Sequence, residues 1–253
     1  MRLGTRGKAL ALAGGIAAAV CGGADAEGFR NIASVTATAY FDGDWRVESS
    51  DVFLARVIPA LTAEARVTRV DSDGWYQHLF HLGPVVSFTD TLYLEAVYGL
   101  GIDSAGLFTH ELDVNLNHET DTTSASLGVK ADWFPQSGYY YYLPSVSGKF
   151  HPLPALGLFG KFFLSIDSEA VLTESFWGQA DWRFSPLLTA RAGFTVSKAR
   201  AFGYSLAAGL DFSFRPAWSL RYSFQYLSDT VEYLSSPQPH SGIANTLVLD
   251  VRF

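Results

Sequence analysis

Apolar and polar residues alternate along most of this chain with a period of two, and this alternation constrains the fold more than any other feature. In FTHELDVNLN, for example, Leu112, Val114 and Leu116 alternate with Asp113 and Asn115. A period of two belongs to a β-strand, whose successive side chains point to opposite faces. No stretch of useful length has the 3.6-residue period of a helix, so we predict an all-β chain.

The alternating runs are about ten residues long and are separated by short polar or Pro/Gly breaks, as is typical of transmembrane β-barrels. The segment 41–50, FDGDWRVESS, is predicted to be a loop. Gly83-Pro84 is expected to form a bulge, because proline cannot donate to a ladder. The predicted strands cover 33–41, 53–58, 63–70, 76–88, 92–103, 108–117, 124–133, 139–150, 156–167, 176–184, 188–197, 204–215, 218–226 and 244–253.

The pattern leaves the number of strands at twelve or fourteen and favours fourteen. The least regular run, 139–150, has four consecutive tyrosines that suit an aromatic girdle, and it would become a loop in a barrel of twelve. The breaks at 89–91, 185–186 and 215–217 are short and follow aromatic strand ends, as periplasmic turns tend to do. With both termini in the periplasm the count must be even, which gives an antiparallel up-and-down barrel of 12–14 strands.

A soluble β-sandwich or barrel is the alternative to a membrane barrel. Its outer faces would be polar and well charged, and its core faces mostly aliphatic. Here the polar faces are rich in Gly, Ser, Thr and isolated charges, while only 17% of residues are charged and 15% are aromatic. This composition favours the membrane barrel.

The N-terminal segment has the three parts of a secretory signal peptide. A basic head with Arg2, Arg6 and Lys8 precedes an apolar run at 9–20 and a small-x-small site that ends at residue 26. About twelve apolar residues are too few to cross a bilayer core of about 30 Å. We therefore predict cleavage after residue 26 and a single barrel domain over 27–253.

The chain without its signal peptide is acidic and lacks cysteine. Removing 1–26 takes away three basic residues, Asp25 and Cys21, so the net charge of −7 becomes about −9. An acidic secreted chain is not expected to have the basic surface that binds the phosphates of nucleic acid. Without disulfides, its stability must come from a large core or a closed sheet.

The last ten residues, ANTLVLDVRF, form an alternating strand that ends on an aromatic residue. In this respect the chain resembles bacterial outer-membrane β-barrel proteins, which characteristically end on such a strand with a terminal Phe. The resemblance implies an outer-membrane location in a Gram-negative-type bacterium, contact with membrane lipid, and recognition of the last strand by the barrel assembly machinery. The residues expected to face lipid and form this assembly signal are Leu247, Leu249, Val251 and Phe253.

Charged residues on the polar faces of five consecutive strands are predicted to line the lumen as a ladder of alternating sign, because neighbouring strands are about 4.8 Å apart. One interpretation is a salt-bridge network that satisfies buried charges and stiffens the wall. The other is a constriction that screens permeating solutes. The residues are Asp181, Arg183, Arg191, Asp211, Arg221, Asp250 and Arg252.

The sequence offers little for catalysis. Some outer-membrane barrels hydrolyse lipids with Ser and His, and His240-Ser241 lies in the loop before the last strand, but adjacent residues of an extended chain point apart. No HExxH, P-loop, GxSxG or Cys/His cluster occurs, so no metal or other cofactor is expected. His78 and His81 lie on opposite faces of one strand and are expected to be interface and lumen residues.

These features predict a narrow channel for small hydrophilic solutes that is not an enzyme. A non-conducting barrel with a structural or surface-interaction role is the alternative, and an outer-membrane lipid hydrolase is a remote third possibility. Nothing in the pattern calls for an oligomer, so a monomer is the default expectation.

Overall fold

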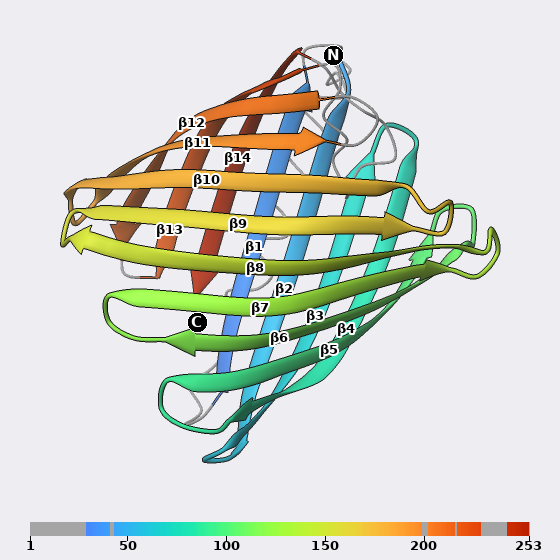
Figure 1. The fold of residues 1–253 in the computed structure, drawn as a ribbon, viewed down its shortest axis with the longest axis horizontal. Helices are drawn as coiled ribbons and strands as arrows, with labels where there is room; N and C mark the ends of the chain where they lie inside the picture. Colours follow the sequence, from blue (N-terminus) through green and yellow to red (C-terminus); the bar gives the residue numbers. More distant parts are fainter. Residues whose placement is uncertain (1–28, 41–42, 199–201, 216, 229–241, 253) are drawn as a thin grey trace, which may run out of the picture.

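A computed structural model describes residues 29–40, 43–198, 202–215, 217–228 and 242–252. They form a closed antiparallel barrel of fourteen strands (Figure 1). The strands are β1 Phe29–Tyr40, β2 Trp45–Ile58, β3 Leu61–Ser72, β4 Trp75–Ser87, β5 Leu92–Asp103, β6 Phe108–Glu119, β7 Thr123–Phe134, β8 Tyr139–Leu153, β9 Leu156–Asp167, β10 Leu172–Ser185, β11 Leu188–Lys198, β12 Phe202–Arg215, β13 Trp218–Leu227 and β14 Gly242–Arg252.

The predicted all-β barrel and its higher strand count are confirmed, including the irregular run at 139–150, which forms β8. The first and last strands close the sheet, with Ile32 opposite Arg252 and Tyr40 opposite Ala244. Closure removes the open edge, so each strand hydrogen-bonds to two neighbours. No helix in the described part of the chain is long and apolar enough to cross a membrane.

Each strand presents one face to the lumen and one to the outer wall. Val67, Phe80 and Leu100 are register partners on β3, β4 and β5, and between 40% and 52% of each residue is exposed on the outer wall. The next residues along, such as Arg66 and His81, face the lumen cavity. The alternation of apolar and polar residues in the sequence therefore corresponds to the outer wall and the lumen face of each strand.

Both described ends of the chain lie at the same end of the barrel, because β1 and β14 are antiparallel and Ile32 pairs with Arg252. The short connections after β4, β10 and β12, which contain the breaks noted in the sequence, lie at that end too. On which side of a membrane this end lies remains a prediction.

Two local predictions are wrong. The segment 41–50 is not all loop, because β2 starts at Trp45 and pairs with Ala39 of β1. Gly83-Pro84 does not add a residue to β4, because the pairings Leu82 with Tyr98 and Val85 with Glu95 keep one register. Only the pairing to β5 is interrupted there. A Cβ on Gly83 would lie 2.0 Å from the Ala96 carbonyl oxygen, so only glycine allows this close approach.

Candidate functional site

Four of the predicted ladder residues form a continuous chain of ion pairs across β10–β13, which we call the β10–β13 ladder. Asp181 of β10 lies opposite Arg191 of β11, with Arg191 Nε 3.6 Å from Asp181 Oδ1. Arg191 also contacts Asp211 of β12 through Nη2, and Asp211 accepts the Nε–H of Arg221 at 3.1 Å. Lys149 of β8 extends the chain, 3.9 Å from Asp181.

The other three predicted members do not join this chain. Arg183 lies where the β10–β11 register shifts, next to the turn. Asp250 and Arg252 are on the lumen face of β14, as their pairing with Ser34 and Ile32 of β1 requires. Among the residues that the structure describes, none of the three makes an ion pair. The sequence therefore predicted that these residues share the lumen face. It did not predict which of their side chains are close enough to form ion pairs.

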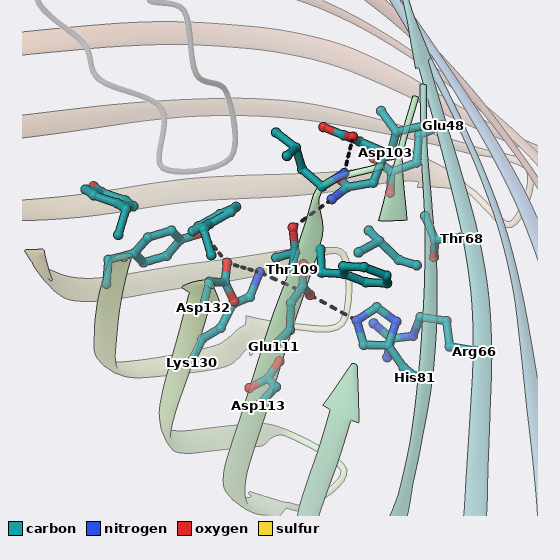
Figure 2. Close-up of a pocket in the computed structure, with 18 of the residues that line it drawn as sticks. Glu48, Arg66, Thr68, His81, Asp103, Thr109, Glu111, Asp113, Lys130 and Asp132 are labelled. Carbon is teal, nitrogen blue, oxygen red and sulfur yellow. Dashed lines mark hydrogen bonds and ion pairs between the residues drawn. The ribbon is translucent and has the colours of Figure 1, made fainter. Parts of the chain in front are cut away.

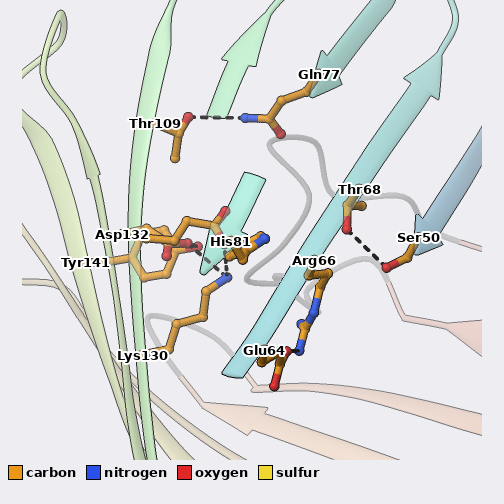
Figure 3. Close-up of polar contacts among 11 residues, drawn as sticks. Ser50, Glu64, Arg66, Thr68, Gln77, His81, Thr109, Lys130, Asp132 and Tyr141 are labelled. Carbon is orange, nitrogen blue, oxygen red and sulfur yellow. Dashed lines mark hydrogen bonds and ion pairs between the residues drawn. The ribbon is translucent and has the colours of Figure 1, made fainter. Parts of the chain in front are cut away.

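A second group of titratable side chains lies on the other wall of the lumen and is here called the His81 cluster. It consists of His81, Glu111, Lys130, Asp132 and Tyr141 (Figures 2 and 3). Glu111 is opposite Asp132 in the register, and Asp132 is opposite Tyr141. One row across β4–β8 therefore carries most of the cluster.

The contacts in the His81 cluster are short. His81 Nε2 lies 3.0 Å from Glu111 Oε2, and Lys130 Nζ lies 3.6 Å from the same oxygen and 3.2 Å from Asp132 Oδ2. Tyr141 donates its hydroxyl to Asp132 Oδ2. The carboxylates are well covered, since the Asp132 side chain is 3% exposed and that of Glu111 is 15% exposed. Covered carboxylates of this kind need the partners they have here.

Gly99 explains how an imidazole on β4 reaches a carboxylate on β6. It is the residue of β5 that lies between His81 and Glu111 in the register. A Cβ at Gly99 would lie 2.4 Å from His81 Cδ2, so the missing side chain leaves the space that the ring fills. A glycine in a strand interior often marks such a close approach.

Two lumen cavities that differ in their charged lining meet at the His81 cluster. The larger, of about 1210 Å³, is bordered by six carboxylates, among them Glu111, Asp113 and Asp132 (Figure 2), and by three basic residues, Arg46, Arg66 and Lys130. The smaller, of about 590 Å³, is bordered by Lys130, Arg191 and Arg221, with no carboxylate among its described lining residues. Lys130 and Tyr141 border both cavities.

The carboxylates of β6 and the arginines of the smaller cavity lie on opposite walls. Glu111 and Asp113 are on β6, and Arg221 is on β13, half-way around the fourteen-strand ring. The smaller cavity also has aromatic surface from Tyr141, Phe163 and Trp177, and the Trp177 ring meets Phe159 edge-on at 4.8 Å. The arrangement can orient a polar or charged solute across the lumen.

The comparisons identify the fold without naming a family. No family model matches the sequence, and no curated protein matches it. Among solved structures, OmpT of Vibrio cholerae expressed in the outer membrane aligns with a TM-score of 0.59 and 8% identity, covering 89% of this chain and 97% of that one. The OmpF complex of Salmonella typhi with daunomycin gives 0.56 and 9%, with coverage of 89% and 97%.

The CymD monoaromatic hydrocarbon channel is a third similar structure, with a TM-score of 0.55, 10% identity and coverage of 89% of this chain and 87% of that one. The chain has the fold of outer-membrane β-barrel porins. This confirms the class of protein that the alternating strands and the terminal strand predict. At such low identity the likeness concerns the fold alone.

Several predicted sites cannot be placed on this fold. Phe253, His240 and Ser241 lie outside the described residues, as does the signal peptide at 1–26. Within the described ranges, no group of three His, Cys, Asp or Glu side chains has the arrangement of a metal site. Leu247 lies on the outer wall and is 38% exposed. Leu249 and Val251 follow it at strand spacing on the same face.

The sequence identified His81 as a lumen residue but did not connect it with Glu111 or Lys130. It also assigned all four consecutive tyrosines to a girdle, whereas Tyr141 borders the lumen and Tyr140 and Tyr142 are 40% and 48% exposed on the outer wall. The period of two could have predicted that these tyrosines face the lumen and the outer wall in turn, because alternate residues of a strand face opposite surfaces.

Proposed function

We propose that this protein is an integral outer-membrane barrel through which small hydrophilic solutes pass passively. The observation that carries the proposal is the pair of adjoining lumen cavities, one bordered by more carboxylates than basic residues and the other by Arg191, Arg221 and Lys130 without a carboxylate among its described lining residues. Charges of opposite sign on facing walls create a field across the lumen, which orients solutes and sorts them by charge.

The proposed solutes are small or extended. Side chains fill the interior of an eight-stranded barrel, whereas barrels of 16–18 strands leave a wide aqueous channel. A barrel of fourteen strands lies between these limits, and the β10–β13 ladder and the His81 cluster narrow it further. The description of the similar CymD structure as a monoaromatic hydrocarbon channel supports conduction through a lumen of this general kind.

Planar-bilayer recordings test the proposal. Folded, detergent-purified protein that shifts its gel migration on heating should give discrete conductance steps. Arg191→Ala together with Arg221→Ala should move the reversal potential in a salt gradient toward cation selectivity, because two positive charges leave the lumen. Leu206→Val on the outer wall is the control and should leave the reversal potential unchanged. Folded protein that gives no conductance steps would overturn the proposal.

A non-conducting structural barrel is the second candidate, and one observation favours it. Every member of the β10–β13 ladder makes at least one ion pair, so these charges can stabilise the wall as a salt-bridge network. In that case the two arginine substitutions would lower the thermal stability of the barrel, and the wild-type protein would show no current.

The location and processing of the chain belong to the same proposal. We expect residues 1–26 to be removed, the barrel assembly machinery to recognise the last strand, and both termini to lie in the periplasm. N-terminal sequencing of the protein from outer membranes should begin at Glu27. Release by carbonate without detergent would contradict an integral membrane position.

A further inference from the structure

The smaller lumen cavity has the size and the lining of a binding site for a small molecule. Its volume of about 590 Å³ falls within the range of about 300–1,000 Å³ that is common for ligand pockets. Arg191 and Arg221 border it near the starts of β11 and β13, whereas Trp177 and its register partner Thr195 border it farther along the strands. A molecule that fills the cavity therefore meets a cationic end and an aromatic end.

The cationic end has positive charge that its own ion pairs do not cancel. The β10–β13 ladder together with Lys149 joins three basic residues to two carboxylates, so one positive charge is in excess. Within the described part of the chain, Arg221 uses only its Nε–H, for Asp211, and a guanidinium has five N–H donors. The Arg221 side chain is 38% exposed, so its remaining donors can hold a carboxylate from the lumen.

The aromatic end consists of an indole beside a floor of very small residues. Trp177 is 37% exposed, and its ring packs edge-on against Phe159 at 4.8 Å between centroids. A Cβ on Gly193 of β11 would lie 3.6 Å from Trp177 Nε1, so the indole extends along the lumen face of the next strand. Gly193 pairs with Ala207 of β12, and neither has a side chain beyond Cβ. This floor leaves space for a flat group beside the indole.

The amide side chains that border the cavity already make hydrogen bonds within the chain. Gln179 donates its Nε2–H to Asp181 at 2.7 Å, and Gln225 donates its Nε2–H to Ser205 at 3.3 Å. A sugar needs hydrogen bonds for its many hydroxyls, because burying an unpaired polar group is costly. An aromatic ring needs only apolar and aromatic surface. The cavity between its two ends therefore favours an aromatic ring over a sugar.

We propose that the smaller cavity binds a small aromatic carboxylate on its way through the lumen. Arg191 and Arg221 hold the carboxylate, and the ring lies over Gly193 and Ala207 beside the Trp177 indole. Arg191 and Gly193 are two residues apart on one face of β11, about 7 Å along the strand, so one ligand reaches both ends. The inference rests on the proposed function, because it names the class of solute for the same lumen, but binding is measured without conduction.

Calorimetric titration of the folded, detergent-solubilised protein with cinnamate tests the site, because cinnamate has one aromatic ring and one carboxylate. We expect saturable binding of one molecule per barrel. Cinnamamide has the same ring without the charge, and glucuronate is a sugar acid without an aromatic ring. Each should bind about tenfold more weakly than cinnamate. Equal binding of either compound, or no binding of cinnamate, would overturn the proposal.

Two matched pairs of variants locate the site. Trp177→Leu should weaken cinnamate binding about fivefold, as expected for the loss of one aromatic contact. Its control is Trp133→Leu, at a residue that is 53% exposed on the outer wall, which should leave the affinity unchanged. Arg221→Gln should weaken binding about tenfold. Its control is Arg183→Gln, because Arg183 is not among the described residues that line the cavity, and the affinity should stay nearly the same.

Heat-modifiable gel migration checks that each variant is folded. An unchanged cinnamate affinity in folded Trp177→Leu or in folded Arg221→Gln would overturn the proposed site. A barrel that conducts but does not bind cinnamate would contradict the site and leave the proposed function standing. A barrel that binds cinnamate as expected but gives no conductance steps would support the site and contradict passage through the lumen.

Discussion

Arg221 donates its Nε–H to Asp211 Oδ1 at 3.1 Å, and Asp211 is also the carboxylate that holds Arg191. Asp211→Asn would leave two guanidiniums sharing one neutral amide in the lumen. We expect a reversal potential shifted toward anions and a free energy of unfolding lower by about 1–3 kcal/mol. Salt-gradient recordings and urea titrations measure the two effects. A shift toward cations would contradict the role given to the ladder.

Glu111 holds both His81 and Lys130, and Glu111→Gln is expected to shift permeation in the same direction as Asp211→Asn, because it also removes a carboxylate from the lumen. Removing this carboxylate weakens the acidic border of the larger cavity, and the reversal potential should move away from cations. The comparison variant is Asn117→Ala, on the same strand and the same face but next to its end. If both variants behave alike, the effect does not come from the His81 cluster.

Gly83 should tolerate no side chain. In Gly83→Ala the new Cβ would lie 2.0 Å from the backbone oxygen of Ala96, so β4 and β5 must separate locally. We expect the amount of folded barrel in the outer membrane to fall severalfold, since overpacking against backbone costs about 1–3 kcal/mol or more. Gly148→Ala is the matched control, because its Cβ would lie 3.4 Å from the nearest atom. Equal membrane levels for the two variants would refute the steric argument.

Deletion of Phe253 is expected to impair insertion of the barrel more than its conduction. The residue is predicted to end the strand that the assembly machinery recognises, whereas the β10–β13 ladder lies on other strands. Quantitative blotting of outer-membrane fractions measures insertion, and single-channel recordings of the protein that does insert measure conduction. Normal membrane levels of the truncated protein would count against an assembly role for Phe253.

The sequence alone limited the number of strands to twelve or fourteen, with fourteen favoured, and it predicted the face of most side chains. Facing depends only on the period of two, so Asp211 and Arg221 could be assigned to the lumen without knowing their neighbours. The prediction failed at 45–50, where Arg46 and Glu48 face the lumen and Val47 and Ser49 face outward. Residues 48–51 are polar on both faces, so the alternating part at 45–48 is too short to predict a strand, and the segment was predicted to be a loop.

Only the register shows that Asp51 shares a row with Val67 and that Glu111 shares one with Asp132. Register and closure join residues far apart in the chain, and local patterning contains no information about how far one strand slides along the next. The sequence therefore determined the barrel and its two surfaces, whereas the tertiary structure decided which charges meet inside it.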